Sequence, residues 1–133
     1  FMSGTNRADP RPLSPHLQIW RPHATMFASI THRFTGMGLY FGTFLIAAWL
    51  IALATGPEAY AQVEAVISCL PAQIILFVWT VAVLFHLAGG IRFLLWDGPH
   101  VGFEPKTASA VSVFLYVFAV LGSVAIWAAV LWL

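Results

Sequence analysis

The sequence predicts an all-α membrane protein with three transmembrane helices, and three observations lead to this fold class. Hydrophobic residues make up 60% of the 133 residues, charged residues only 8%, and the mean hydropathy is +0.85. A soluble domain carries about a quarter charged residues. Three apolar runs each reach the roughly 20 residues that a helix needs to cross a bilayer. The length is that of a single domain.

Residues 1–24 are expected to form a cytoplasmic and interfacial N-terminal segment. Its first 22 residues are polar and lack the apolar stretch of a cleaved signal peptide, so the first span is expected to act as an uncleaved membrane signal. Residues 13–21 form a short amphipathic stretch that we expect at the membrane surface, with Trp20 as an aromatic anchor.

The transmembrane domain is expected to cover residues 25–133, with helices at about 25–54, 71–96 and 108–133. Helix-breaking or helix-starting residues separate the three runs, and these are Gly56, Pro57, Pro71, Asp97, Gly98 and Pro99. Pro71 suits the first turn of the second helix, where its missing N–H is not needed. Thr107 is expected to cap the third helix.

The distribution of basic residues predicts the orientation. Three arginines precede the first span, and Arg92 and Lys106 flank the connection between the second and third spans. Residues 55–70 contain two glutamates and no Lys or Arg. The positive-inside rule then places the N-terminus in the cytoplasm and the C-terminus on the opposite side. The expected location is a bacterial inner membrane, with the mitochondrial inner membrane as the alternative.

Several function classes find no support in the sequence. The formal net charge is +1 without a basic run, so nucleic acid is not an expected partner. The single cysteine, Cys69, excludes an internal disulfide and a cysteine-based metal site. There is no glycine-rich phosphate loop, no HExxH motif and no Ser-His-Asp set. A small transporter or channel is disfavoured because the spans contain neither paired charges nor broken helices.

The stretch SITHRFTG, residues 29–36, places polar groups at the start of the first span. Ser29, His32, Arg33, Gly36 and Tyr40 recur at helical spacing and are expected to form one stripe. Polar residues inside a span are costly and point to a function. The alternative is that the His-Arg pair extends toward the lipid headgroups.

His86 lies deeper in the membrane. It precedes Asp97 by eleven residues, or about 16 Å of helix, which is near the middle of a hydrocarbon layer about 30 Å thick. Gly89 and Gly90 share its face, and an imidazole over a glycine gap suits a haem. The spacing alone equally allows close helix packing, with His86 hydrogen-bonded to a neighbouring group.

The other histidines limit the haem hypothesis. His32 is expected higher in the membrane, so a six-coordinate haem would need its second axial ligand from another chain. The haem carboxylates would then favour the cationic end, where His32 and Arg33 would donate charge-assisted hydrogen bonds to propionates or to the carbonyl of a quinone.

Three motifs together resemble the cytochrome b556 membrane-anchor family of succinate dehydrogenase, respiratory complex II. They are RPLSPHLQIW at 11–20, SITHRFTG at 29–36 and HLAGGIRFLLWD at 86–97, and they occur in the family's order. The resemblance covers the chain from Arg11 onward. It implies a three-helix anchor that pairs with a second anchor subunit around one shared haem b. It also implies docking of a flavoprotein subunit with FAD and of an iron–sulfur subunit.

The resemblance assigns roles to individual residues. It implies that His86 is the axial ligand of the haem iron, that Ser29 and Arg33 help to bind ubiquinone, and that His32 and Arg33 approach the haem propionates. No residue is expected to be catalytic in the chain alone. Family members commonly have histidine where this chain has Phe93, which puts a haem-edge or proton-relay role at that position in doubt.

The sequence is therefore expected to encode the haem b-binding anchor of succinate:ubiquinone oxidoreductase, an electron-transport and tricarboxylic acid cycle enzyme. Two alternatives stay open. The first is the anchor of a quinol:fumarate reductase, because the sequence does not set the direction of the reaction. A cofactor-free structural anchor, with His86 as a packing residue, is the second.

Overall fold

A computed structural model describes residues 19–132, and they are almost entirely helical. The four helices are α1, Ala24–Thr55; α2, Pro57–Ile67; α3, Leu70–Asp97; and α4, Pro105–Trp132. Of these, α1, α3 and α4 are long and apolar enough to cross a membrane. The predicted all-α membrane fold with three spans is confirmed. Most of the predicted surface helix at 13–21 lies outside the described residues.

The helix boundaries follow from glycine and proline chemistry. Gly56 has a φ of 136°, a conformation that side-chain-bearing residues rarely adopt, and it separates α1 from α2. Pro57 and Pro71 each stand in the first turn of a helix, where no N–H is required. Pro105 does the same for α4, which begins three residues earlier than predicted. Thr107 therefore lies inside the first turn and is not the cap.

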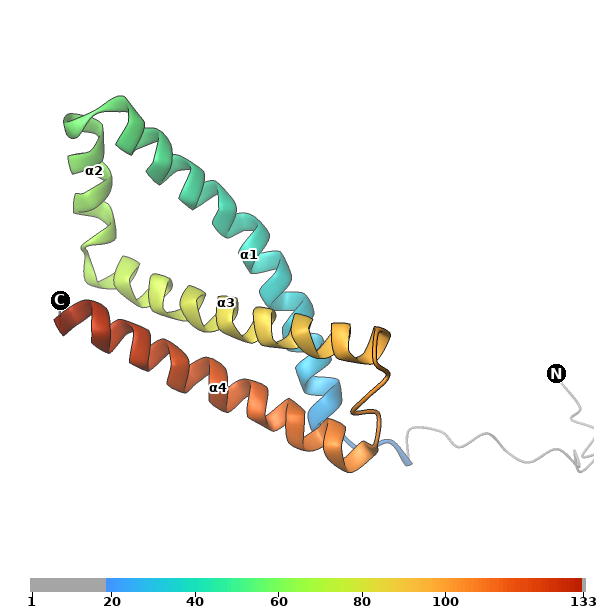
Figure 1. Ribbon diagram of the computed structural model, residues 1–133. Helices are drawn as coiled ribbons and strands as arrows, with labels where there is room; N and C mark the ends of the chain where they lie inside the picture. The colour runs from blue at the N-terminus through green and yellow to red at the C-terminus, as the bar shows by residue number, and fades with distance from the viewer. Residues whose placement is uncertain (1–18, 133) are drawn as a thin grey trace, which may run out of the picture.

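The segment between the first two spans differs from the expected connection, because residues 57–67 form the helix α2. This segment contains mostly good helix formers, and Glu58 in its first turn favours the helix dipole. Figure 1 shows that α2 joins the far ends of α1 and α3. The three helices enclose an open triangle in that view.

All three spans pack together only around the crossing of α1, whereas α3 and α4 also stay in contact toward the α2 end, where Trp127 Nε1 donates to the Thr80 hydroxyl at 3.1 Å. α3 and α4 run side by side in opposite directions, and α1 crosses them near its own N-terminal half before it diverges toward α2 (Figure 1). The buried centre consists of Ala28, Phe85, Leu115 and Ala119, which come from all three spans. Polar side chains are also paired here, as the Thr31 and Tyr116 hydroxyls lie 2.7 Å apart.

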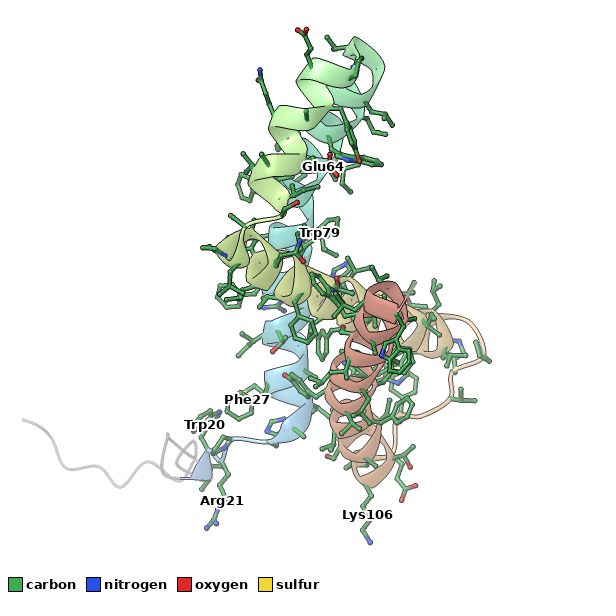
Figure 2. The ribbon with its side chains drawn as sticks, turned by 90° about the vertical axis from the view of Figure 1, so that its left-hand side faces the viewer. Trp20, Arg21, Phe27, Glu64, Trp79 and Lys106 are labelled. Carbon is green, nitrogen blue, oxygen red and sulfur yellow. The ribbon has the colours of Figure 1, made fainter. Side chains whose placement is uncertain are left out.

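Among the described residues, the α2 end carries only acidic side chains, whereas the opposite end carries basic side chains together with Asp97 and Glu104. Figure 2 shows Arg21 and Lys106 at the end where α1 and α4 begin, and Glu64 at the α2 end. Arg92, which we expected near the second connection, lies in the last turns of α3 and is only 5% exposed. Large apolar side chains cover the outside of all three spans. Such a surface suits lipid or another membrane-embedded chain.

Candidate functional site

Two histidines from different helices meet where α1 crosses α3. The imidazoles of His32 and His86 stack with their ring centroids 3.9 Å apart and their planes inclined by 16°. Phe93, one turn beyond Gly89 on α3, contacts the His32 ring edge-on at 5.1 Å. We call the two stacked residues the histidine clasp.

Hydrogen bonds hold the histidine clasp in a reciprocal arrangement. Nδ1 of His86 lies 3.1 Å from the main-chain oxygen of His32, and Nε2 of His32 lies 3.2 Å from the main-chain oxygen of His86. A carbonyl oxygen only accepts, so the nitrogen in each pair carries the proton and donates. Each imidazole therefore binds the other residue's backbone, and α1 and α3 are joined twice at the same level.

Two glycines make this close approach possible. A Cβ atom at Gly36 would lie 2.9 Å from Cε1 of His86, and one at Gly89 would lie 2.5 Å from Cδ2 of His32. Gly36 follows His32 by one helical turn, and Gly89 follows His86 by nearly one turn. Each helix thus provides an imidazole and, beside it, the space for the imidazole of the other helix.

The clasp leaves His86 suited to bind iron. Its Nδ1–H is held by a carbonyl, so Nε2 is the nitrogen with the free lone pair. Within residues 19–132, Nε2 of His86 has no hydrogen-bond partner. The buried side-chain atoms without a partner in this part of the chain are Nε1 of Trp79 and Nε of Arg92, so Nε2 of His86 is accessible at the surface of the chain. A metal-bound histidine characteristically donates its other N–H to a carbonyl or carboxylate. The residues present therefore fit a haem ligated through Nε2.

The structure corrects two expectations about this region. His32 was expected above His86 in the membrane, yet the oblique crossing of α1 and α3 brings the two rings to the same level. The glycine pair beside His86 was expected to leave room for a macrocycle, but Gly89 accommodates the His32 ring. Gly90 faces open space, with nothing within 4 Å of a Cβ placed there.

The predicted stripe on α1 divides into two parts. His32 and Gly36 face α3, Ser29 is half-buried at the border of this face, and Arg33 and Tyr40 lie on the exposed flank beside it. Arg33 is exposed and Tyr40 is 64% exposed in this chain. Ser29 and Arg33, one turn apart, thus share a surface next to the histidine clasp and are not buried within the bundle.

Two functional candidates were not predicted. The first is Thr35, whose hydroxyl lies 3.2 Å from Nδ1 of His86.

The second is Arg92, whose Nη1 donates to the Ser112 hydroxyl at 2.8 Å. Its guanidinium lies 4.6 Å from the centre of the Trp96 ring, and its Nε has no hydrogen-bond partner among the described residues. The signal for Arg92 was its place in the chain, five residues and about 7.5 Å inside the end of α3, where charged residues are costly.

A groove of about 550 Å³ lies on another face of α3, between α3 and α4. Its walls are almost wholly apolar and include Leu87, Ile91 and Phe118. By helical periodicity these α3 residues point away from the face that carries His86 and Gly89. The groove is thus separate from the histidine clasp.

Comparisons with known proteins agree with this architecture. The sequence model of the succinate dehydrogenase/fumarate reductase transmembrane subunit family matches residues 7–126. The succinate dehydrogenase cytochrome b556 subunit of Rickettsia prowazekii (strain Madrid E) is 34% identical over 88% of this chain and 90% of the relative. The subunit of the same name from Paracoccus denitrificans is 39% identical over 80% and 81%, respectively.

A mitochondrial relative matches as well. The succinate dehydrogenase cytochrome b560 subunit of Mus musculus is 35% identical over 69% of this chain and 56% of the relative. The three long apolar helices and the similarity to the Rickettsia and Paracoccus subunits together fit a multi-pass protein of the bacterial inner membrane. The chain belongs to the succinate dehydrogenase/fumarate reductase transmembrane subunit family.

Proposed function

We propose that this chain is the haem b-binding membrane anchor of succinate:ubiquinone oxidoreductase, and that it forms part of the ubiquinone site. The observation that carries the proposal is the His86 imidazole, whose Nδ1–H is held by the His32 carbonyl while Nε2 stays free at the surface of the chain. The relatives support haem b, because each is named as a cytochrome b subunit of succinate dehydrogenase.

The second axial ligand comes from a second membrane anchor subunit. His32 would not be a second ligand, because its ring stacks on that of His86 and its Nε2 donates to the His86 carbonyl. When bound, the haem accepts and releases single electrons during electron transfer to the quinone. His86 Nε2 is the atom of this chain that ligates it.

His32 and Arg33 approach the haem propionates in this proposal, in different ways. Nε2 of His32 is already used by the His86 carbonyl, so Nδ1 is its remaining polar atom. Nδ1 donates to a carboxylate only when the ring is an imidazolium. Arg33 has no such limit, since a guanidinium is always charged and its side chain is exposed. Arg33 is therefore the stronger partner for an anionic group.

The ubiquinone site involves the Ser29–Arg33 flank of α1. The two side chains are one helical turn apart, and Arg33 is exposed while Ser29 is half-buried beside it. Arg33 and the Ser29 hydroxyl donate hydrogen bonds to the quinone oxygens. Donors placed there stabilise the negative charge that develops as the quinone is reduced. The protons come from the solvent on the near side of the membrane.

The cationic end of the molecule is the cytoplasmic end and the docking side for the other subunits. Arg21 and Lys106 lie at this end, and the glutamates of α2 lie at the other (Figure 2). This separation follows the positive-inside rule. The flavoprotein with its FAD and the iron–sulfur subunit with its clusters then deliver electrons next to Ser29 and Arg33.

The quinone site is tested by Arg33→Leu in the complex purified through this chain. Loss of one charge-stabilising donor is expected to lower ubiquinone reduction by on the order of 10²-fold. Succinate oxidation by a soluble dye is expected to stay at the wild-type rate, because that reaction uses the other subunits. Arg21→Leu is the matched control, since Arg21 is an exposed arginine at the same end of the chain.

Equal loss of both activities in Arg33→Leu would count against the quinone role and indicate an assembly defect. A purified complex without flavin and iron–sulfur subunits would contradict the anchor function itself. A complex that contains those subunits but lacks the absorption bands of a b-type haem would favour the cofactor-free anchor. The direction of the reaction is taken from the relatives, which are named as succinate dehydrogenase subunits.

A further inference from the structure

The hydroxyl of Thr35 lies at the point where α1 receives the His86 ring. Thr35 Oγ1 is 2.9 Å from the main-chain oxygen of Thr31, 3.0 Å from that of His32 and 3.2 Å from Nδ1 of His86. The His32 oxygen is itself 3.1 Å from the same Nδ1. One ring nitrogen of α3 thus faces two oxygen atoms of α1, a hydroxyl and a carbonyl.

The direction of these hydrogen bonds follows from the number of protons available. The Thr35 hydroxyl has one proton and two carbonyl oxygens of its own helix, Thr31 and His32, within reach as acceptors. If Nδ1 were unprotonated, its lone pair would face that of the His32 carbonyl 3.1 Å away. The arrangement is satisfied when Nδ1 carries the proton and shares it between the His32 carbonyl and the Thr35 oxygen.

We propose that Thr35 is a positioning residue for the His86 ligand, a role that rests on the proposed function of His86 in haem binding. Its oxygen is the second acceptor for the Nδ1–H of His86. Two acceptors fix the orientation of the His86 ring and keep the proton on Nδ1, so Nε2 is the atom presented to iron. A single acceptor leaves the ring free to turn about that one hydrogen bond.

The second acceptor also has an electronic effect. Hydrogen bonds to the outer N–H of a ligating histidine raise the basicity of the metal-bound nitrogen. A more basic ligand favours ferric over ferrous iron, which lowers the reduction potential. Thr35 is therefore expected to hold the haem potential below the value that the His32 carbonyl alone would set.

The test replaces the hydroxyl without changing the shape of the side chain. Thr35→Val removes the acceptor, and Thr35→Ser keeps it. Thr43→Val is the matched control, because the Thr43 hydroxyl is on the same helix, donates to its own Tyr40 carbonyl and is exposed away from α3. All variants are measured in the full purified complex for haem content, the reduction potential of the haem and its low-spin electron paramagnetic resonance signal.

Thr35→Val is expected to raise the haem potential, shift the resonance signal and weaken haem retention by up to about tenfold, the lower end of the usual effect of losing an outer-shell partner. Thr35→Ser and Thr43→Val are expected to match the wild type. If Thr35→Val prevents assembly, Thr35→Ala is measured instead, since it also lacks the hydroxyl and is smaller.

Three outcomes overturn the inference, and loss of the proposed function is distinguishable from loss of the Thr35 role alone. A wild-type complex without haem, or one whose haem spectrum does not depend on His86, removes the proposed function and this role with it. A haem that depends on His86 but keeps its potential and resonance signal in both Thr35→Val and Thr35→Ala removes the role of Thr35 alone. A shift in Thr35→Ser as large as in Thr35→Val also overturns it.

Discussion

Buried polar groups at the crossing of the helices depend on single partners. Arg92 is 5% exposed, and its Nη1 donates to Ser112, whose hydroxyl is fully buried and in turn donates to the Ala108 carbonyl at 2.7 Å. The guanidinium also lies over the Trp96 and Phe93 rings. Such contacts stabilise a cation away from water only as a set. Removing the Ser112 hydroxyl leaves Nη1 of Arg92 without its hydrogen-bond acceptor.

We therefore expect Ser112→Ala to lower the stability of the purified complex by about 1–2 kcal/mol, because Nη1 of Arg92 loses its acceptor. The measurement is thermal unfolding in detergent. Ser123→Ala is the control, since Ser123 is also fully buried on α4 and donates only to its own helix. Similar stability losses in the two variants would contradict the role given to the Arg92–Ser112 hydrogen bond.

The sequence predicted which polar residues lie in the spans but not which of them meet. Hydropathy and helical spacing identified His32 and His86 as unusual positions. Their contact depends on how α1 crosses α3, and a single sequence contains no measure of that crossing. The sequence indicated Arg92 only as a residue flanking the second connection, whereas its burial depends on α4, whose Ser112 hydroxyl accepts a hydrogen bond from Nη1.

At the scale of helices, glycines fix the crossing of α1 and α3. Gly36 and Gly89 leave space for the two imidazoles, and Gly42 lies directly against the Trp79 ring farther along the α1–α3 contact. Small residues allow transmembrane helices to approach closely, and their spacing sets where the contact occurs. The spans themselves were predictable from hydropathy. Helix α2 was not, because its two glutamates gave the segment the composition of a solvated connection.

Gly89→Ala is expected to separate α1 from α3, because the new Cβ would lie 2.5 Å from Cδ2 of His32. Overpacking of this kind costs about 1–3 kcal/mol. We expect a lower unfolding temperature together with loss of haem from the purified complex.

Gly38→Ala provides the control for this prediction, since nothing lies within 4 Å of a Cβ at that position. There the change is expected to be neutral or slightly stabilising, because alanine favours a helix by up to about 1 kcal/mol over glycine. If Gly89→Ala kept its haem and its unfolding temperature, the histidine clasp would not require this glycine.

At the scale of the whole molecule, the chain leaves much of its apolar surface uncovered. The outer halves of α1 and α3 diverge, and large apolar side chains such as Phe44 and Ile75 remain exposed. Such faces need either lipid or another chain. The proposed orientation across the membrane rests on the charged ends, because the exposed Arg21 and Lys106 lie at the end opposite the glutamates of α2.

The single cysteine offers a direct test of that orientation. Cys69 is exposed at the start of α3, on the α2 side of the molecule. A maleimide that does not cross membranes is expected to label it in spheroplasts and not in sealed inside-out vesicles. A variant with Cys69→Ser and His100→Cys, whose new cysteine lies in the exposed α3–α4 connection, is expected to show the opposite pattern. The same pattern in both variants would contradict the proposed topology.

The central claim is that Nε2 of His86 ligates a haem b shared with a neighbouring subunit. Its most direct test is the optical and electron paramagnetic resonance spectrum of the complex purified with His86→Leu, beside His100→Leu as a control for an exposed histidine. We expect the low-spin b-type spectrum of the wild type to persist in His100→Leu and to disappear, or become high-spin, in His86→Leu. An unchanged low-spin spectrum in His86→Leu would show that the iron has a different ligand.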